Sequence, residues 1–190
     1  MKSIKIIRVI EDQLLQRIGF SLVYKSVFAE APYFETYTDD WVAENVWYMH
    51  LRNGYIVLAL SGEKVIGLGC SIRLTKIIPN DPNIEVKNFL FQRDNIPINL
   101  SRTCYMSEIA VLPDYRSKGI GRSLIQRRFI LAKTDGMSYF IMRTAQSGSM
   151  SENLYLNLGA KDAGIVQDIS DHAEKINSSS RFRKYLYGEL

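Results

Sequence analysis

Residues 107–125 read SEIAVLPDYRSKGIGRSLI and form the most informative stretch of the sequence. Its first residues predict a strand that ends at Val111, and the proline and two glycines that follow lead into an amphipathic helix. Small residues in such a turn let consecutive backbone N–H groups point into one concavity, where the helix N-terminus adds partial positive charge. The turn therefore predicts a site for a phosphate or pyrophosphate, with Arg116 and Lys118 supplying full charges at its rim.

Two other phosphate-binding patterns do not fit this turn. A Walker loop needs a Lys–Ser/Thr pair after its last glycine, where Arg122 and Ser123 stand here. A dinucleotide-binding fingerprint needs three glycines and an acidic residue about twenty positions later, and neither is present. Taken alone, two glycines in a strand-to-helix turn are more often structural than functional.

Hydrophobic periodicity extends the pattern over the rest of the chain. We expect strands at residues 4–10, 55–60, 64–74, 103–111, 137–144, 160–169 and 182–190, and helices at 11–29, 38–53, 119–133 and 149–158. Strand, helix, strand in the middle of this order requires a crossover, and therefore some parallel pairing in a mixed sheet. The sequence shows no domain boundary or repeat, so we expect residues 1–190 to form a single domain.

Residues 75–102 are the least regular stretch. They contain Pro79, Pro82 and Pro97, with a possible short helix at residues 85–91. A connection of this length inside one domain is usually functional or mobile. We expect it to act as a lid.

Composition narrows the function. The chain has 190 residues and a net charge of +4, which suits a small anionic ligand better than nucleic acid, whose binders show a denser basic stripe. Two cysteines and two histidines give no zinc-binding spacing, so no metal is expected. The longest apolar run, residues 55–60, is too short to cross a membrane, and charges interrupt the N-terminal segment, so we expect a cytoplasmic protein with no membrane partner.

The stretch at residues 107–125 resembles motif A of the GNAT superfamily of acetyl-CoA-dependent N-acetyltransferases. Downstream, YLNLGA at residues 155–160 resembles the end of motif B, Tyr-x-x-x-Gly-Phe. The chain departs from that motif with Ala160 in place of Phe, and again at Gly148, where many members carry Asn. The second departure puts one side-chain contact to the cofactor in doubt. Its candidate replacements are Gln146, Ser149 and Asn153.

The resemblance implies an α/β fold of the α+β type. It would have a GNAT-like mixed, mostly antiparallel central sheet of about seven strands, flanked by about four helices and splayed between the fourth and fifth strands. The pantetheine arm of acetyl-CoA would enter the gap and pair with the backbone of Ile109, Ala110 and Val111, as in strand addition. The pyrophosphate would lie on Arg116, Ser117, Lys118, Gly119, Ile120, Gly121 and Arg122, with Asn153 as a further cofactor contact.

The resemblance also implies a reaction, in which a neutral amine attacks the thioester and a thiolate leaves. Tyr155 resembles the family tyrosine that protonates this thiolate; the alternative is an amphipathic core tyrosine. Glu108 is the candidate base, acting through water, and its alternative is a structural contact to backbone or to Arg143. Because side chains alternate along a strand, Glu108 and Tyr105 point to opposite faces unless a bulge intervenes.

Acidic and aromatic residues follow the first predicted helix, where the acceptor wall of the family usually forms. They are Glu30, Tyr33, Phe34, Glu35, Tyr37, Asp39, Asp40 and Trp41. Carboxylates beside aromatic faces suit a cationic amine, so Tyr33, Glu35 and Asp39 are the predicted substrate-binding residues. The alternative is a solvated loop with a helix cap.

Together, these features predict an enzyme that transfers the acetyl group of acetyl-CoA to a primary amine by direct attack in a ternary complex. A small-molecule acceptor is favoured because the lid would crowd a peptide groove. The alternatives are a protein or peptide N-acetyltransferase and a non-catalytic acyl-CoA-binding module. The protein could form a homodimer.

Overall fold

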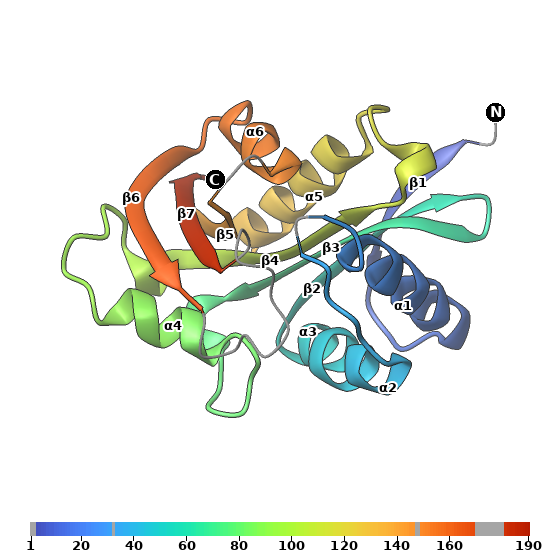
Figure 1. The fold of residues 1–190 in the computed structure, drawn as a ribbon, viewed down its shortest axis with the longest axis horizontal. Helices are drawn as coiled ribbons and strands as arrows, with labels where there is room; N and C mark the ends of the chain where they lie inside the picture. The colour runs from blue at the N-terminus through green and yellow to red at the C-terminus, as the bar shows by residue number, and fades with distance from the viewer. Residues whose placement is uncertain (1–2, 32, 147–148, 170–180) are drawn as a thin grey trace.

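A computed structural model describes residues 3–31, 33–146, 149–169 and 181–190 (Figure 1). Its sheet has seven strands in the order β1-β2-β3-β4-β5-β7-β6. The strands are β1 (Ile4–Val9), β2 (Gly54–Ser61), β3 (Lys64–Arg73), β4 (Thr103–Val111), β5 (Tyr139–Ala145), β6 (Lys161–Asp168) and β7 (Phe182–Glu189). The helices are α1 (Leu14–Phe28), α2 (Asp39–Val42), α3 (Tyr48–Asn53), α4 (Ile84–Phe91), α5 (Ile120–Thr134) and α6 (Met150–Leu156). The mixed, mostly antiparallel sheet that we predicted is confirmed.

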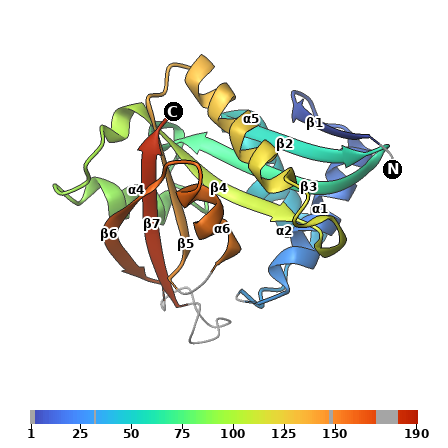
Figure 2. The same ribbon diagram turned by 90° about the horizontal axis from the view of Figure 1, so that it is seen from above.

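The sheet opens between β4 and β5, its one parallel pair among the described strands. These strands pair over three residues only, from Thr103 opposite Tyr139 to Tyr105 opposite Ile141. Beyond Tyr105 they diverge, as Figure 2 shows, so the edge of β4 that faces β5 is free over residues 106–111. This confirms the predicted splay.

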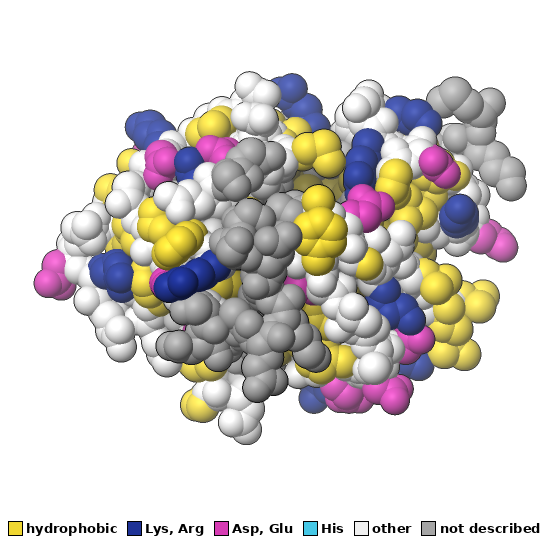
Figure 3. Space-filling model, in the orientation of Figure 1, with side chains coloured by type: hydrophobic (Ala, Val, Ile, Leu, Met, Phe, Trp, Pro, Cys, Tyr) yellow, Lys and Arg dark blue, Asp and Glu magenta, His cyan; other side chains and the backbone are white. Residues whose placement is uncertain are grey.

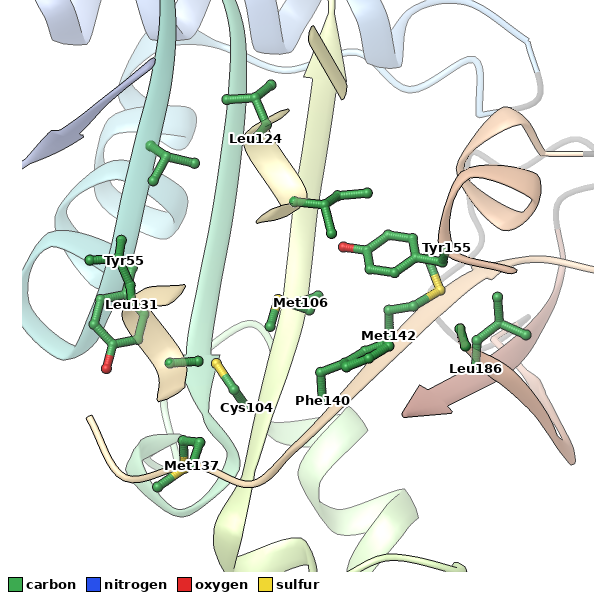
Figure 4. Close-up of a cluster of buried hydrophobic side chains, with 14 of the residues drawn as sticks. Tyr55, Cys104, Met106, Leu124, Leu131, Met137, Phe140, Met142, Tyr155 and Leu186 are labelled. Atoms are coloured by element: carbon green, nitrogen blue, oxygen red, sulfur yellow. The ribbon is translucent and has the colours of Figure 1, made fainter. Parts of the chain in front are cut away.

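Helices cover both faces of the sheet (Figure 2). On one face, Leu124 and Leu131 of α5 join a cluster of buried side chains that includes Tyr55, Cys104 and Met106 (Figure 4). On the other face, α1 and the α2–α3 helix pack against β2, β3 and β4 through a second cluster. A π-helical turn, Ala43–Trp47, joins α2 to α3, so the helix predicted at residues 38–53 forms with a local irregularity.

The outer face of α1 is apolar. Leu14, Ile18 and Leu22 carry the helical spacing in the sequence, yet their side chains are exposed, as are other apolar side chains nearby (Figure 3). The buried face consists of Phe20, Val23, Tyr24 and Phe28. The spacing therefore predicted the helix correctly, but the helix packs through larger side chains on its other side.

A β-bulge interrupts β4. Cys70 of β3 pairs with Glu108, and Ile72 pairs with Tyr105. A step of two residues along β3 therefore lies opposite a step of three residues along β4. One extra residue reverses the alternation of side chains along a strand. The bulge therefore brings Tyr105 and Glu108 to the same face, which is the exception that the sequence analysis left open.

The segment 75–102 carries α4, which an ion pair attaches to the sheet. Val86 and Leu90 of α4 are fully buried in a third core cluster, which includes Ile72, Tyr105 and Ile141 of the sheet. Glu85 accepts a hydrogen bond from Nη1 of Arg143 on β5 over 2.6 Å.

Across the described ranges, we find no helix with the length and apolar character needed to span a membrane.

Candidate active site

A cavity of about 1210 Å³ opens where β4 leaves β5. Its walls are β4 from Tyr105 to Val111, the turn that begins α5, residues 33–38, residues 79–85, and parts of α6 and β7. The free edge of β4 and the turn before α5 therefore share one continuous space with the loop that follows α1.

The turn before α5 has the backbone of an anion cradle. Ser117 and Gly119 both adopt positive φ, at 59° and 78°, and Gly119 is the N-cap of α5. A side chain is strained at such a φ, which explains the glycine at position 119. At Gly121 a Cβ would lie 3.0 Å from Cδ2 of Leu154, so this position also favours glycine. These residues fit the phosphates of the cofactor that the sequence implied.

Side chains around this turn divide into two groups. Arg116 lines the cavity, where it binds the carbonyl of Val111 over 3.0 Å and Glu30 over 2.9 Å. Ser117, Gly119, Ile120, Gly121 and Arg122 also line it. Lys118 is not among the described lining residues, because its Nζ donates to the carbonyl of Asp114 over 2.6 Å.

On α6, the predicted cofactor contact Asn153 is exposed and lies outside the cavity lining that the structure describes. Five of its neighbours line the cavity instead: Ser149, Met150, Ser151, Leu154 and Asn157. Of the other candidates, Ser149 lines the cavity and also caps α6 by accepting from the backbone of Glu152. Gly148 lies outside the described residues.

Glu108 faces the cavity from β4 and is half-buried. Burial raises the pKa of its carboxyl to about 8, and the nearby carboxylate of Glu35 adds to that shift, whereas Arg143 and Arg128 oppose it. A carboxyl group with such a pKa can take up and release a proton near neutral pH, as a general base requires.

Tyr155 is fully buried in α6 and is not among the described residues that line the cavity. Its ring packs near Phe129 and Phe140, and Figure 4 shows its hydroxyl directed towards β4. Burial raises the pKa of the phenol, while Arg128 beside it acts in the opposite direction.

Arg128 of α5 escaped the sequence analysis. Its guanidinium is fully buried and donates to the carbonyls of Cys70 and Glu108, over 2.8 and 2.9 Å, and to the hydroxyl of Tyr155 over 2.8 Å. Gly69 leaves room for it, because a Cβ there would lie 2.9 Å from Nε of Arg128. The available signal was its position on the apolar face of the helix, four residues after Leu124.

His50 of α3 is outside the described cavity lining and has a structural role beside it. Its Nδ1 lies 2.8 Å from the carbonyl of Val46, which can only accept, so this nitrogen carries the hydrogen. Nε2 then accepts from the hydroxyl of Ser107 over 2.6 Å. Burial lowers the pKa of His50 to about 4, so the ring is neutral at pH 7 and anchors the bulge of β4.

The predicted acceptor residues separate in space. Tyr33 and Glu35 both line the cavity. Phe34 between them has a positive φ of 52°. The hydroxyl of Tyr37 donates a hydrogen bond to the carboxylate of Glu35. Asp39 is not part of the described lining. Instead it binds Ser21 and pairs with Lys25 over 2.7 Å at the start of α2, and these contacts lower the pKa of its carboxyl. Asp39 therefore lies in the first turn of a helix, as in the alternative given in the sequence analysis.

Residues 23–160 match the model of the Acetyltransferase (GNAT) family. The chain belongs to the GNAT acetyltransferase family. The members of this family are acetyltransferases. Its fold agrees: the ribosomal-protein-alanine N-acetyltransferase of Brucella melitensis superposes with a TM-score of 0.68 at 12% identity, over 98% of this chain and 99% of the other. An acetyltransferase of Bacillus subtilis, solved in complex with CoA, gives 0.62 at 18% identity over 99% of each chain.

A curated relative of this GNAT acetyltransferase is the thialysine N-epsilon-acetyltransferase of Mus musculus. It is 36% identical over 61 residues, which are 32% of this chain and 36% of the relative. The match thus spans about a third of the length of that enzyme.

The two cysteines of this GNAT acetyltransferase are not suited to nucleophilic catalysis. Cys70 and Cys104 are fully buried, and burial raises the pKa of both thiols, that of Cys104 to about 12. The thiolate is the reactive form, so neither group is activated. Within the described ranges, no group of three or more His, Cys, Asp and Glu side chains could hold a metal ion.

Proposed function

We propose that residues 1–190 act as a single domain that transfers the acetyl group of acetyl-CoA to the primary amine of a small molecule, by direct attack in a ternary complex. One observation carries the proposal. A single cavity joins the cradle at the start of α5 to the free edge of β4, to Glu108 and to Glu35. Donor and acceptor can therefore meet in the same space without a covalent enzyme intermediate.

The donor would bind through the residues of motif A. Arg116, Ser117, Gly119, Ile120, Gly121 and Arg122 would hold its phosphates, with Lys118 adding only longer-range charge. The backbone of Ile109, Ala110 and Val111 would pair with the pantetheine amides. When bound, acetyl-CoA supplies the acetyl group as an activated thioester.

Glu108 would receive the proton that the acceptor amine loses, directly or through water. Its carboxyl faces the cavity, and its raised pKa makes the carboxylate a stronger base than an ordinary glutamate. Glu35 would help to draw a protonated amine into the cavity.

Tyr155 would donate a proton to the departing thiolate. Its oxygen accepts a hydrogen bond from Arg128, and a guanidinium cannot accept one in return. The hydrogen of the Tyr155 hydroxyl is therefore left for another acceptor, and the hydroxyl is directed towards the strand that would carry the pantetheine arm (Figure 4). The alternative, a core tyrosine with no chemical role, is tested below.

A small acceptor is favoured over a protein because α4 and the residues before it narrow the acceptor side. Asn80, Asp81 and Asn83 line the cavity, and the ion pair of Glu85 with Arg143 holds α4 against β5. A peptide would have to displace this segment.

The test is an amine panel containing polyamines, aminoglycosides, amino acids and short peptides, with acetyl-CoA and detection of the free thiol. We expect turnover with small amines and a much lower rate for Glu108→Gln. Turnover with peptides alone would show a peptide acetyltransferase. Tight CoA binding without turnover across the panel would instead favour the non-catalytic module.

A further inference from the structure

Arg183 of β7 is a buried cation that faces the cavity. The residue is 5% exposed and forms part of the cavity wall. Its Nη1 is buried and has no hydrogen-bond partner within the part of the chain that the structure describes. The sequence gives no local signal for this position.

The surroundings of Arg183 leave its charge incompletely compensated. Nη2 lies 3.8 Å from Oε1 of Glu35, which is longer than a hydrogen bond, and the guanidinium carbon lies 5.5 Å from the centre of the Tyr33 ring. Arg143, on the neighbouring strand, is different: its Nη1 binds both Glu85, over 2.6 Å, and Gln167, over 3.2 Å. Of these two guanidinium groups on the cavity wall, that of Arg143 is paired, whereas Nη1 of Arg183 has no hydrogen-bond acceptor among the described residues.

A buried N–H donor without an acceptor lowers the stability of the fold, and the loss of free energy is larger when the donor is charged. A guanidinium presents its N–H groups in a planar fork that matches a carboxylate. An anionic group that enters the cavity beside Arg183 would receive those N–H groups. The phosphates of the donor are already provided for at the start of α5, on a different element of the cavity wall.

We infer that Arg183 binds a carboxylate of the acceptor, so that the acceptor is an amino carboxylate. The inference rests on the proposed function, because it assigns the amine of that acceptor to Glu108 and Glu35. Glu108 and Glu35 would then face the ammonium end of the acceptor, and Arg183 its carboxylate end.

The experiment compares unbranched ω-amino carboxylates of two to six carbons with alkylamines of the same chain length, under saturating acetyl-CoA. We expect at least one amino carboxylate to exceed its matched alkylamine in kcat/KM by about tenfold or more, as one hydrogen bond to a charged group allows. Arg183→Gln should bring that ratio close to one, and Arg183→Lys should keep part of it. The control is Arg181→Gln, which removes the same charge from an exposed residue that pairs with Asp168, and it should keep the ratio.

A second readout does not depend on turnover. Calorimetry with CoA already bound should detect the preferred amino carboxylate binding to the wild-type protein and show that binding lost in Arg183→Gln. If Arg183 were only structural, its variants would slow both acceptors equally and leave the ratio unchanged.

An unchanged ratio would overturn the inference, as would alkylamines that react as well as amino carboxylates. Acetylation of the alkylamines would then still support the proposed function. Loss of CoA binding in Arg183→Gln, with the ratio kept, would assign the residue to the donor and also overturn the inference. If no member of either series reacted or bound, the inference would fail together with the proposed small-molecule acceptor.

Discussion

Nη2 of Arg128 donates a hydrogen bond to the hydroxyl of Tyr155 over 2.8 Å, and Nη1 of the same side chain donates to the carbonyls of Cys70 on β3 and Glu108 on β4. One buried cation thus connects α5, α6 and the strand that carries Glu108. The same guanidinium therefore binds the hydroxyl of the proposed acid, Tyr155, and the backbone carbonyl of the proposed base, Glu108.

Tyr155→Phe should lower kcat by roughly ten- to a thousandfold, the effect of removing a positioned acid, while the KM for acetyl-CoA changes little because the ring still packs. The variant leaves Arg128 without one acceptor, so its melting temperature is measured alongside the kinetics. Tyr187→Phe, on β7 and away from the described cavity lining, is the matched control. An unchanged kcat, with chemistry rate-limiting, would reduce Tyr155 to a packing residue.

Gly121→Val should abolish CoA binding, because a branched side chain would occupy the cradle and already meets Leu154 at its Cβ. The control is Ser123→Val, two residues later in the same helix and outside the described lining. Titration calorimetry checks both variants. A folded Gly121→Val protein that binds CoA normally would remove this turn from the donor site.

The pH dependence of kcat/KM should show an ascending limb with an apparent pKa near 8, because burial and Glu35 raise the pKa of Glu108 to about 8. The rate rises with pH as the carboxylate forms. Glu35→Gln removes a repulsive charge, so it should move this limb to lower pH, and Glu108→Gln should remove it. A limb that stays in place in both variants would belong to the acceptor amine instead.

Glu35→Gln should raise the KM of a cationic acceptor and weaken its dependence on salt, whereas Asp39→Asn should leave both unchanged. Both residues are acidic and neighbours in sequence, but only Glu35 lines the cavity, whereas Asp39 pairs with Lys25. Steady-state kinetics at low and high salt provide the test. An equal effect of both variants would mean that long-range charge, rather than contact, attracts the acceptor.

The stability of the protein should fall in acid partly through His50. Burial lowers the pKa of its ring from 6.5 to about 4, so between these values the unfolded chain binds the proton more readily than the native state. The stability that His50 contributes is therefore present above pH 6.5 and is lost as the pH falls to about 4. Urea unfolding at several pH values should show a shallower decline for His50→Gln, and parallel curves would contradict this.

Local signals in the sequence were sufficient for the fold and for the position of the glycine turn before α5. The proline and glycines before α5 punctuate the chain, and this turn has the positive φ angles that such a cradle needs. The acceptor half depends on tertiary placement. Glu35 and Asp39 look alike as acidic residues near aromatic ones, but Glu35 lines the cavity and Asp39 pairs with Lys25.

The residues that the sequence analysis missed share a physical reason. Arg128 and Arg183 are charged groups whose neighbours, such as Tyr155 and Glu35, come from other elements, so no spacing along the chain reveals them. The face of α1 was misleading for a related reason: the apolar periodicity is present, but the bulkier residues pack better against the sheet.

The space above Gly69 has a consequence for the evolution of this chain. A Cβ at that position would lie 2.9 Å from Arg128, so any larger residue there would have to arrive after, or together with, a smaller residue at position 128. The two positions cannot drift independently. Homologous sequences that keep the arginine should therefore keep the glycine, and those with a larger residue at position 69 should have a smaller residue at position 128.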